Sequence, residues 1–210
     1  MRETSRVIVM RPVLEISPSD GFALWPVAGV RPFHHLPLSG ELSATEVATA
    51  VMGIAACNDL DPEHDGRPPR PTDPLDSFLH GLLTFEDLFV AGGLRVVDTV
   101  NGVEFLPGCC SGLEEWRAWA GVVDGSGSPS FGHDPDPLAE RVGDVVRLVV
   151  DAERSDSEVI ELSVTDYRHL VEGAGRDLAD FLALAMSWVS ENLPTRSAQV
   201  NAALARALDL

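Results

Sequence analysis

The chain contains no lysine, so all fifteen of its basic residues are arginines. Against them stand 33 acidic residues, which give a formal net charge of −18 at pH 7. A negative field of this size repels phosphate backbones and argues against a nucleic-acid partner. The acidity serves either solubility and salt adaptation or the recognition of a partner, and a charged partner would then be basic. The arginine-rich, lysine-free composition is typical of a GC-rich bacterial or haloarchaeal genome.

Long apolar runs are also missing. The longest, Leu178–Val189, has twelve residues, contains Asp180 and is too short to span a bilayer. The amino-terminal segment is interrupted by Arg11 and Pro12 and does not have the pattern of a signal peptide. The three cysteines cannot all pair with one another, and this odd count suits a reducing compartment. We therefore expect a cytoplasmic protein that makes no membrane contact.

Motifs that would identify an enzyme are absent as well. The chain has no GxSxG nucleophile elbow, no GxGxxG or P-loop glycine pattern, no HExxH and no CxxC pair. This absence favours a binding protein over an enzyme, and we expect neither a cofactor nor a bound metal.

The length and the apolar content predict a single domain. A chain of 210 residues with 45% apolar composition can bury a core without disulfides. We assign this domain to residues 1–210. Proline, glycine and polar residues gather in three segments that we expect to be irregular, namely 18–42, 58–74 and 124–138.

Strands are predicted where apolar residues alternate around turn signals. Two β-rich runs flank Asn101-Gly102, a pair that supplies positive φ at both central positions of a type I′ hairpin turn. A second hairpin has strands over Val145–Asp151 and Val159–Val164 on either side of a polar turn. Near the amino terminus a further β-branched segment contains Pro12, which is typical of an edge strand or of two short strands with a break between them.

Helices are predicted from capping signals and periodicity. Ser43 and Glu46 form a capping box ahead of an apolar helix. After Asp166 the apolar residues recur at every third or fourth position, which predicts a long amphipathic helix split near Gly173 and Gly175, followed by a final helix. The fold class is therefore α+β, with an antiparallel sheet of hairpins (about four to six strands), about five helices and a helical C-terminal part.

The segment LPGCCSGLEEWRAW, residues 106–119, places Cys109 and Cys110 directly before a predicted helix. A second capping box, formed by Ser111 and Glu114, marks the start of that helix. The partial positive charge at a helix N-terminus favours the thiolate form of a nearby cysteine. A nucleophilic cysteine also needs a base, and the sequence does not say which of the six histidines comes near, namely His34, His35, His64, His80, His133 and His169.

Two interpretations of these cysteines stay open. Either one of them is reactive, or both simply pack in a turn ahead of a capped helix. Adjacent cysteines are poor partners on one zinc ion, because tetrahedral sites usually take their paired thiolates from residues separated by two to four others. We therefore predict no metal site and treat Cys109, Cys110 and His133 as the candidates for catalysis if the protein is an enzyme.

Acidic residues on two of the irregular segments are candidates for binding. They are Asp59, Asp61, Glu63, Asp65, Asp134 and Asp136. On outward-facing loops such residues would form an acidic face that attracts a basic protein. The alternative is that the aspartates only make turns beside proline and glycine.

In size and charge the chain is similar to immunity proteins that neutralise polymorphic toxins. This resemblance implies an intracellular inhibitor whose acidic face covers a basic toxin or enzyme, and it assigns no site residue. One alternative is a small enzyme or thiol-based redox sensor that uses Cys109 or Cys110. Another is a structural or scaffold component, for which an exposed Trp116 or Trp119 would be the anchor. The oligomeric state is left open.

Overall fold

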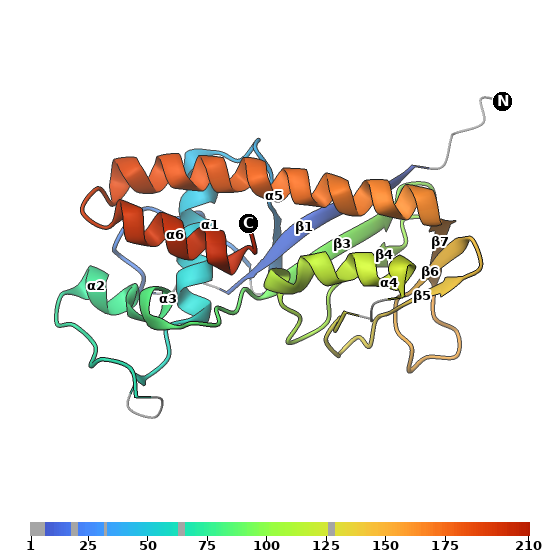
Figure 1. Ribbon diagram of the computed structural model, residues 1–210, viewed down its shortest axis with the longest axis horizontal. Coiled ribbons are helices and arrows are strands. Elements are labelled where there is room, and N and C mark those ends of the chain that lie inside the picture. Colours follow the sequence, from blue (N-terminus) through green and yellow to red (C-terminus); the bar gives the residue numbers. More distant parts are fainter. Residues whose placement is uncertain (1–6, 18–20, 32, 63–65, 126–128) are drawn as a thin grey trace. The chain divides into compact units, whose positions relative to one another are not determined.

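The computed structural model describes residues 7–17, 21–31, 33–62, 66–125 and 129–210 (Figure 1). Over these residues the chain forms two antiparallel sheets, of four and three strands, and six α-helices, which confirms the α+β class. The chain divides into two compact units. Unit 1 comprises Met1–Val13 and Gly92–Asp177, and unit 2 comprises Leu14–Ala91 and Leu178–Leu210. The assignment of residues 1–210 to one domain stays a prediction.

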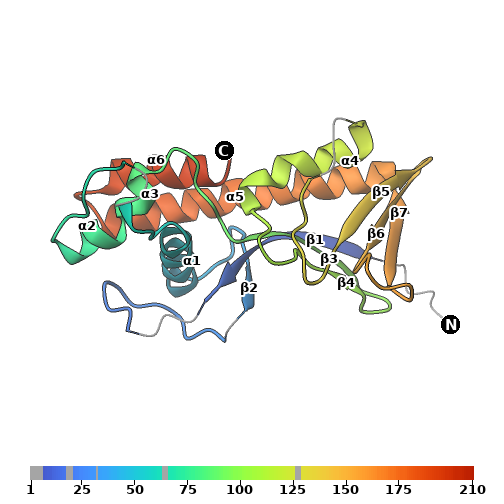
Figure 2. The same cartoon turned by 90° about the horizontal axis from the view of Figure 1, so that it is seen from below.

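Unit 1 contains most of the strands. Its complete elements are β3 (Gly92–Asp98), β4 (Glu104–Phe105), the 3-10 helix η2 (Leu113–Ala120), α4 (Gly121–Asp124), β5 (Leu138–Val142), β6 (Val145–Val149) and β7 (Val159–Ser163). The last three strands form a sheet in the order β5-β6-β7, in which neighbours in sequence lie side by side (Figure 2).

Unit 2 is mainly helical. It contains the short strand β2 (His34–Pro37) and the helices α1 (Ala44–Cys57), α2 (Pro74–Phe78), α3 (His80–Thr84) and α6 (Ser197–Ala207). The boundary between the units falls inside two elements, the strand β1 (Ile8–Ile16) and the helix α5 (Val164–Asn192). In unit 2, α6 folds back beside the second half of α5 (Figures 1 and 2).

β1 is an internal strand of the four-stranded sheet, whose order is β2-β1-β3-β4. β1 is also continuous through Pro12, so both alternatives predicted for this segment, an edge strand and two short strands with a break, are wrong. The backbone N–H of Thr99 donates to the Val7 carbonyl, and that of Glu15 donates to the Ala91 carbonyl, at the two ends of the β1–β3 pair. These bonds place the odd-numbered residues of β1 at hydrogen-bonding positions toward β3. Pro12 is even-numbered, so it removes no hydrogen bond from that pair.

Both predicted hairpins are present, but the turn of the first differs from the prediction. β3 and β4 pair antiparallel with Val96 opposite Phe105. Of the Asn101-Gly102 pair only Gly102 has positive φ, at 76°. A type I′ turn needs positive φ at both central residues. The prediction of a type I′ turn is therefore wrong. A longer loop over residues 99–102 closes the hairpin instead.

The second hairpin follows the prediction and is extended by one strand. β6 and β7 pair antiparallel, with Val145 opposite Ser163. The additional strand is β5, which pairs with β6 so that Val142 lies opposite Val145. Gly143 has φ 65° at the first position of the two-residue turn between them, as a type II′ turn requires. The Gly143-Asp144 pair is the sequence signal for this turn.

The two helix-start predictions had opposite outcomes. Ser43 and Glu46 form the capping box at α1, with the Glu46 carboxylate 2.8 Å from the Ser43 backbone nitrogen. Hydrogen bonds from the Ser43 side chain and backbone hold the pKa of Glu46 below its usual value. The capping box of Ser111 and Glu114 is wrong, because η2 begins one residue later, with Gly112 at its N-cap and no side-chain cap.

α5 is continuous over Val164–Asn192, so the predicted split is also wrong. Gly175 has a packing role within unit 1. A Cβ added at Gly175 would lie 2.7 Å from the ring of Trp116, so only glycine lets this ring lie against the helix.

Each unit has an aromatic cluster in its core. In unit 1 the rings of Phe105, Trp119 and Phe131 meet edge to face, the closest pair with centroids 4.9 Å apart. The Tyr167 hydroxyl donates to the Trp119 carbonyl at 3.0 Å, and burial raises the pKa of Tyr167. In unit 2, Trp25 packs against three rings, those of Phe22, Phe78 and Trp188. In the first cluster, Phe131 anchors the segment that carries His133.

Candidate functional site

Two segments of unit 1 are joined backbone to backbone and bring Cys109 and His133 together. The Cys109 N–H donates to the His133 carbonyl at 2.6 Å, and the His133 N–H donates to the Cys109 carbonyl at 3.0 Å. The Gly108 N–H also donates to the Phe131 carbonyl at 2.7 Å. We call segments 107–111 and 131–135 the cysteine loop pair.

Two glycines allow this close approach. A Cβ added at Gly108 would lie 2.6 Å from the Pro135 carbonyl oxygen and 2.7 Å from His133 backbone atoms. One added at Gly132 would meet the carbonyl oxygens of Gly108 and Cys109, the former at 2.6 Å. Gly132 also has φ 81°, a conformation that glycine adopts without steric cost. The geometry of the site therefore depends on residues without side chains.

A tight turn exposes the two thiols. The Ser111 N–H donates to the Gly108 carbonyl at 3.2 Å, which puts Cys109 and Cys110 at the central positions. Cys110 has φ 65°, the left-handed region that a non-glycine residue adopts at an energetic cost. Both cysteines are exposed, and their Sγ atoms lie 3.5 Å apart. The turn thus departs from an extended chain, in which neighbouring side chains point to opposite faces.

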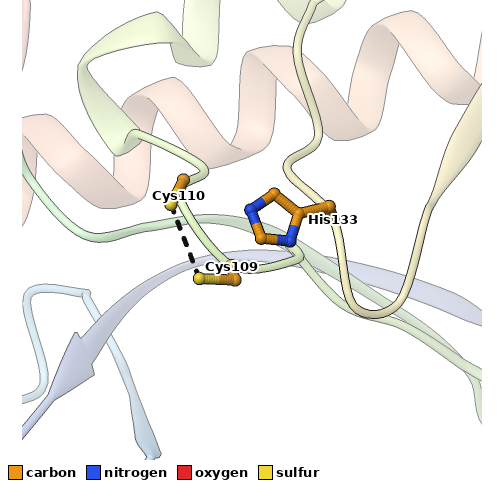
Figure 3. A group of neighbouring side chains, drawn as sticks. All are labelled: Cys109, Cys110 and His133. Atoms are coloured by element: carbon orange, nitrogen blue, oxygen red, sulfur yellow. Dashed lines mark hydrogen bonds between the residues drawn. The ribbon is translucent and has the colours of Figure 1, made fainter.

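His133 completes a cluster with these sulfurs. Its Nδ1 lies 3.3 Å from an Asp134 carboxylate oxygen, and a proton shared in this contact leaves Nε2 available as an acceptor or ligand. Figure 3 shows Nε2 on the side of the ring that faces Cys110. One ligand atom from each of Cys109, Cys110 and His133 lies within 4.8 Å of the other two. The structure therefore brings together the three residues that the sequence analysis named as candidates for catalysis.

The spacing of the sulfurs suits a shared metal ion. A tetrahedral ion with metal–sulfur bonds of roughly 2.3 Å holds two sulfurs about 3.8 Å apart. The observed 3.5 Å is close to this value before any side-chain rotation. Adjacent cysteines are expected to be poor partners on one metal because paired zinc ligands are usually separated by two to four residues. Here the left-handed backbone of Cys110 brings its sulfur within 3.5 Å of that of Cys109, although the two residues are adjacent.

The predicted acidic residues are distributed over both units. Asp59 and Asp61 belong to unit 2, whereas Asp134 and Asp136 belong to unit 1, and all four are exposed. Asp59 forms an ion pair with Arg70. Two further candidates, Glu63 and Asp65, lie outside the described residues.

The candidate anchor residues are buried. Trp116 is 7% exposed and Trp119 is 3% exposed. The guanidinium of Arg117 lies over the Trp116 ring, 4.4 Å from its centroid. Neither tryptophan therefore offers the exposed anchor that the scaffold hypothesis requires.

Sequence reasoning missed the pairing of residues 107–111 with residues 131–135. The signal that could have found it is the pair Gly108 and Gly132, because glycine next to a candidate residue often marks a close approach of two backbones. Cys57, the third cysteine, is half-buried at the end of α1 in unit 2 and takes no part in the cluster.

Comparison of the chain with protein-family models, with curated proteins and with solved structures gives no match in any of the three. In the part of the chain that the structure describes, no helix combines the length and the apolar character needed to cross a membrane.

Proposed function

We propose that the protein is a thiol-based redox sensor in which Cys109 and Cys110 are oxidised together. The observation that carries the proposal is a pair of exposed sulfurs 3.5 Å apart on one turn. His133 is the neighbouring group that can accept a thiol proton. Oxidants reach exposed thiols, and a second thiol close by can convert the resulting sulfenic acid into a disulfide.

The oxidant in this proposal is a hydroperoxide. A thiolate sulfur attacks the peroxide oxygen, so that an S–O bond forms while the O–O bond breaks and water or an alcohol leaves. The neighbouring sulfur then attacks the sulfenic sulfur, so that an S–S bond forms while the S–O bond breaks, and the departing oxygen takes up the thiol proton and leaves as water. Two electrons pass from the sulfurs to the peroxide, and a thiol reductant reverses the change.

A disulfide between adjacent residues suits a reversible signal. The Cα atoms of neighbouring residues are about 3.8 Å apart across a trans peptide, whereas ordinary disulfides join Cα atoms roughly 4.4–6.8 Å apart. The Cys109–Cys110 disulfide would be strained, and strained, exposed disulfides are the labile and regulatory ones. Reduction would therefore be easy.

Stoichiometric hydrogen peroxide tests the proposal. Intact mass should fall by two hydrogen atoms, peptide mapping should place the bond at Cys109–Cys110, and dithiothreitol should restore the thiols. Cys57→Ser should behave as the wild type, whereas Cys109→Ser and Cys110→Ser should stop at the sulfenic acid. Oxidation centred on Cys57, or no loss of mass in the folded protein, would contradict the proposal.

A second candidate is an acidic inhibitor or immunity protein that binds a basic partner. The observation that favours it is the net charge of −18, together with exposed carboxylates such as those of Asp134 and Asp136. Electrostatic attraction would make association fast and sensitive to salt.

Purification of the tagged protein from its host at low salt, followed by identification of stoichiometric partners, tests this candidate. The association rate with a basic partner should fall strongly when salt is raised to about 0.5 M. An unchanged rate would remove the electrostatic argument.

A further inference from the structure

We propose that the reduced side chains of Cys109, Cys110 and His133 bind one thiophilic d10 metal ion, Cu⁺ in preference to Zn²⁺. The inference rests on the same exposed thiols as the proposed sensor, and it gives them a ligand. The donor set consists of two sulfurs and one imidazole nitrogen within 4.8 Å of one another. Thiolate donors select Cu⁺ and Zn²⁺ over hard cations, and imidazole is compatible with both.

The site is largely preorganised. The reciprocal backbone hydrogen bonds between Cys109 and His133, at 2.6 and 3.0 Å, hold the two chain segments in register. The turn from Gly108 to Ser111 fixes the second sulfur 3.5 Å from the first. Small rotations of three exposed side chains would be enough to close them on one ion, so little ordering opposes binding.

Asp134 supports the histidine as an outer-shell residue. A metal-binding histidine commonly donates its other ring N–H to a carboxylate, which fixes the tautomer and the ring orientation. The 3.3 Å contact between His133 Nδ1 and the Asp134 carboxylate has this arrangement, and Nε2 faces Cys110 (Figure 3). Asp134 is therefore a positioning residue.

The number of donors favours the monovalent ion. Over the described residues, the group that meets the mutual 4.8 Å limit contains only these three donors. Three soft donors complete a trigonal Cu⁺ site, whereas Zn²⁺ prefers four ligands and would need water in the open position. Two thiolates and a neutral imidazole also give a net charge of −1 with Cu⁺.

Metal occupancy would regulate the sensor. A thiolate that binds an ion uses the lone pair that would attack a peroxide, so the loaded protein should oxidise more slowly than the metal-free protein. The two uses of the site therefore compete for the same sulfurs.

The test is an anaerobic titration of the reduced full-length protein with Cu⁺ against a chromophoric Cu⁺ chelator, without peroxide. We expect one ion per chain for the wild type and for the matched control Cys57→Ser. Cys109→Ser, Cys110→Ser and His133→Ala should each weaken binding at least about 100-fold, because loss of an outer-shell partner alone costs about 10–100-fold. Circular dichroism confirms that each variant is folded.

Several outcomes would overturn the inference. They are the absence of stoichiometric Cu⁺ binding, equal affinity in wild type and His133→Ala, and loss of binding in Cys57→Ser. A parallel titration with Zn²⁺ that gives tighter binding at the same residues would overturn the choice of Cu⁺. Because peroxide is absent, failure here is separate from failure of the redox proposal, which the mass change after oxidation decides.

Discussion

The cysteine loop pair and the described residues of segment 58–74, which we call the acidic loop, are both irregular and rich in polar side chains, but they use those side chains differently. In the acidic loop, arginines bind the loop's own oxygens. Arg70 pairs with Asp59 and donates to the Leu60 carbonyl at 2.9 Å, and Arg67 donates to the same carbonyl at 3.1 Å. Arg67 also lies over the Phe85 ring, 3.6 Å from its centroid.

In the cysteine loop pair the backbone provides the cohesion. Backbone hydrogen bonds and close-packed glycines hold the two segments, and the side chains of Cys109, Cys110 and His133 are left facing solvent. The comparison teaches that a polar residue on a loop is available for function when its neighbours satisfy the loop by other means. The Asp59 carboxylate forms an ion pair with Arg70, whereas the Sγ atoms of the exposed Cys109 and Cys110 lie 3.5 Å apart.

The largest loss of stability and of Cu⁺ binding is expected from a substitution that forces the two segments of the cysteine loop pair apart. Gly132→Ala combines a positive φ with a clash against the Gly108 carbonyl oxygen, and we expect it to cost about 3 kcal/mol and to abolish Cu⁺ binding. Urea unfolding measures the cost. The matched control is Gly102→Ala, which has φ 76° but open space around its Cβ and should cost only about 1 kcal/mol. Equal losses would show that the approach of the segments is not tight.

The next effect should follow from removing the arginine that binds the acidic loop together. Arg70→Ala loses the ion pair with Asp59 and hydrogen bonds to the carbonyls of Leu60 and Ser77, so we expect a loss of about 2 kcal/mol in urea unfolding. Arg154→Ala removes an ion pair with Asp156 in which both side chains are well exposed, at 64% and 76%, so it should leave the free energy of unfolding nearly unchanged. If both variants lose the same free energy of unfolding, Arg70 does not hold the acidic loop together.

A smaller loss of stability is expected on acidification, from the ion pair of Asp76, which lies in α2 just after the acidic loop. The Arg196 guanidinium, 2.6 Å from the Asp76 carboxylate, holds the pKa of Asp76 below its usual value. A depressed folded-state pKa stabilises the protein above the unfolded-state pKa, about 3.9, and this contribution disappears as pH falls through the folded-state value. Asp76→Asn should therefore be less stable than the wild type at pH 7, and the difference should shrink below about pH 4. A difference independent of pH would contradict the ion-pair assignment.

The smallest effect on stability is expected from substitution of Asp134, which should nevertheless weaken Cu⁺ binding measurably. Asp134→Gly removes the carboxylate beside His133 and suits the φ of 53°, so stability should change by less than about 0.5 kcal/mol while Cu⁺ binding weakens about 10-fold. Asp134→Asn keeps an oxygen acceptor for Nδ1–H and should retain most of the affinity. Identical affinities in wild type and Asp134→Gly would remove Asp134 from the site.

Local signals predicted much of the fold. The capping box of Ser43 and Glu46 and the hairpin of β6 and β7 depend on residues a few positions apart, and both are present. Where the prediction was wrong, a distant contact had decided the outcome. Gly175, expected to interrupt α5, instead receives the Trp116 ring. Pro12, expected on an edge, lies where its missing N–H costs no bond to β3.

In the candidate site, too, some features follow from the local sequence and others from distant contacts. The sequence determined that Cys109 and Cys110 are adjacent, that glycines surround them, and that the chain carries a strong negative charge. Only the tertiary structure decided that His133 is their neighbour and that both sulfurs face solvent together. The reason is physical: turns and caps depend on short-range sterics and hydrogen bonds, whereas the pairing of residues 107–111 with residues 131–135 depends on the packing of Phe131 against Phe105 and Trp119.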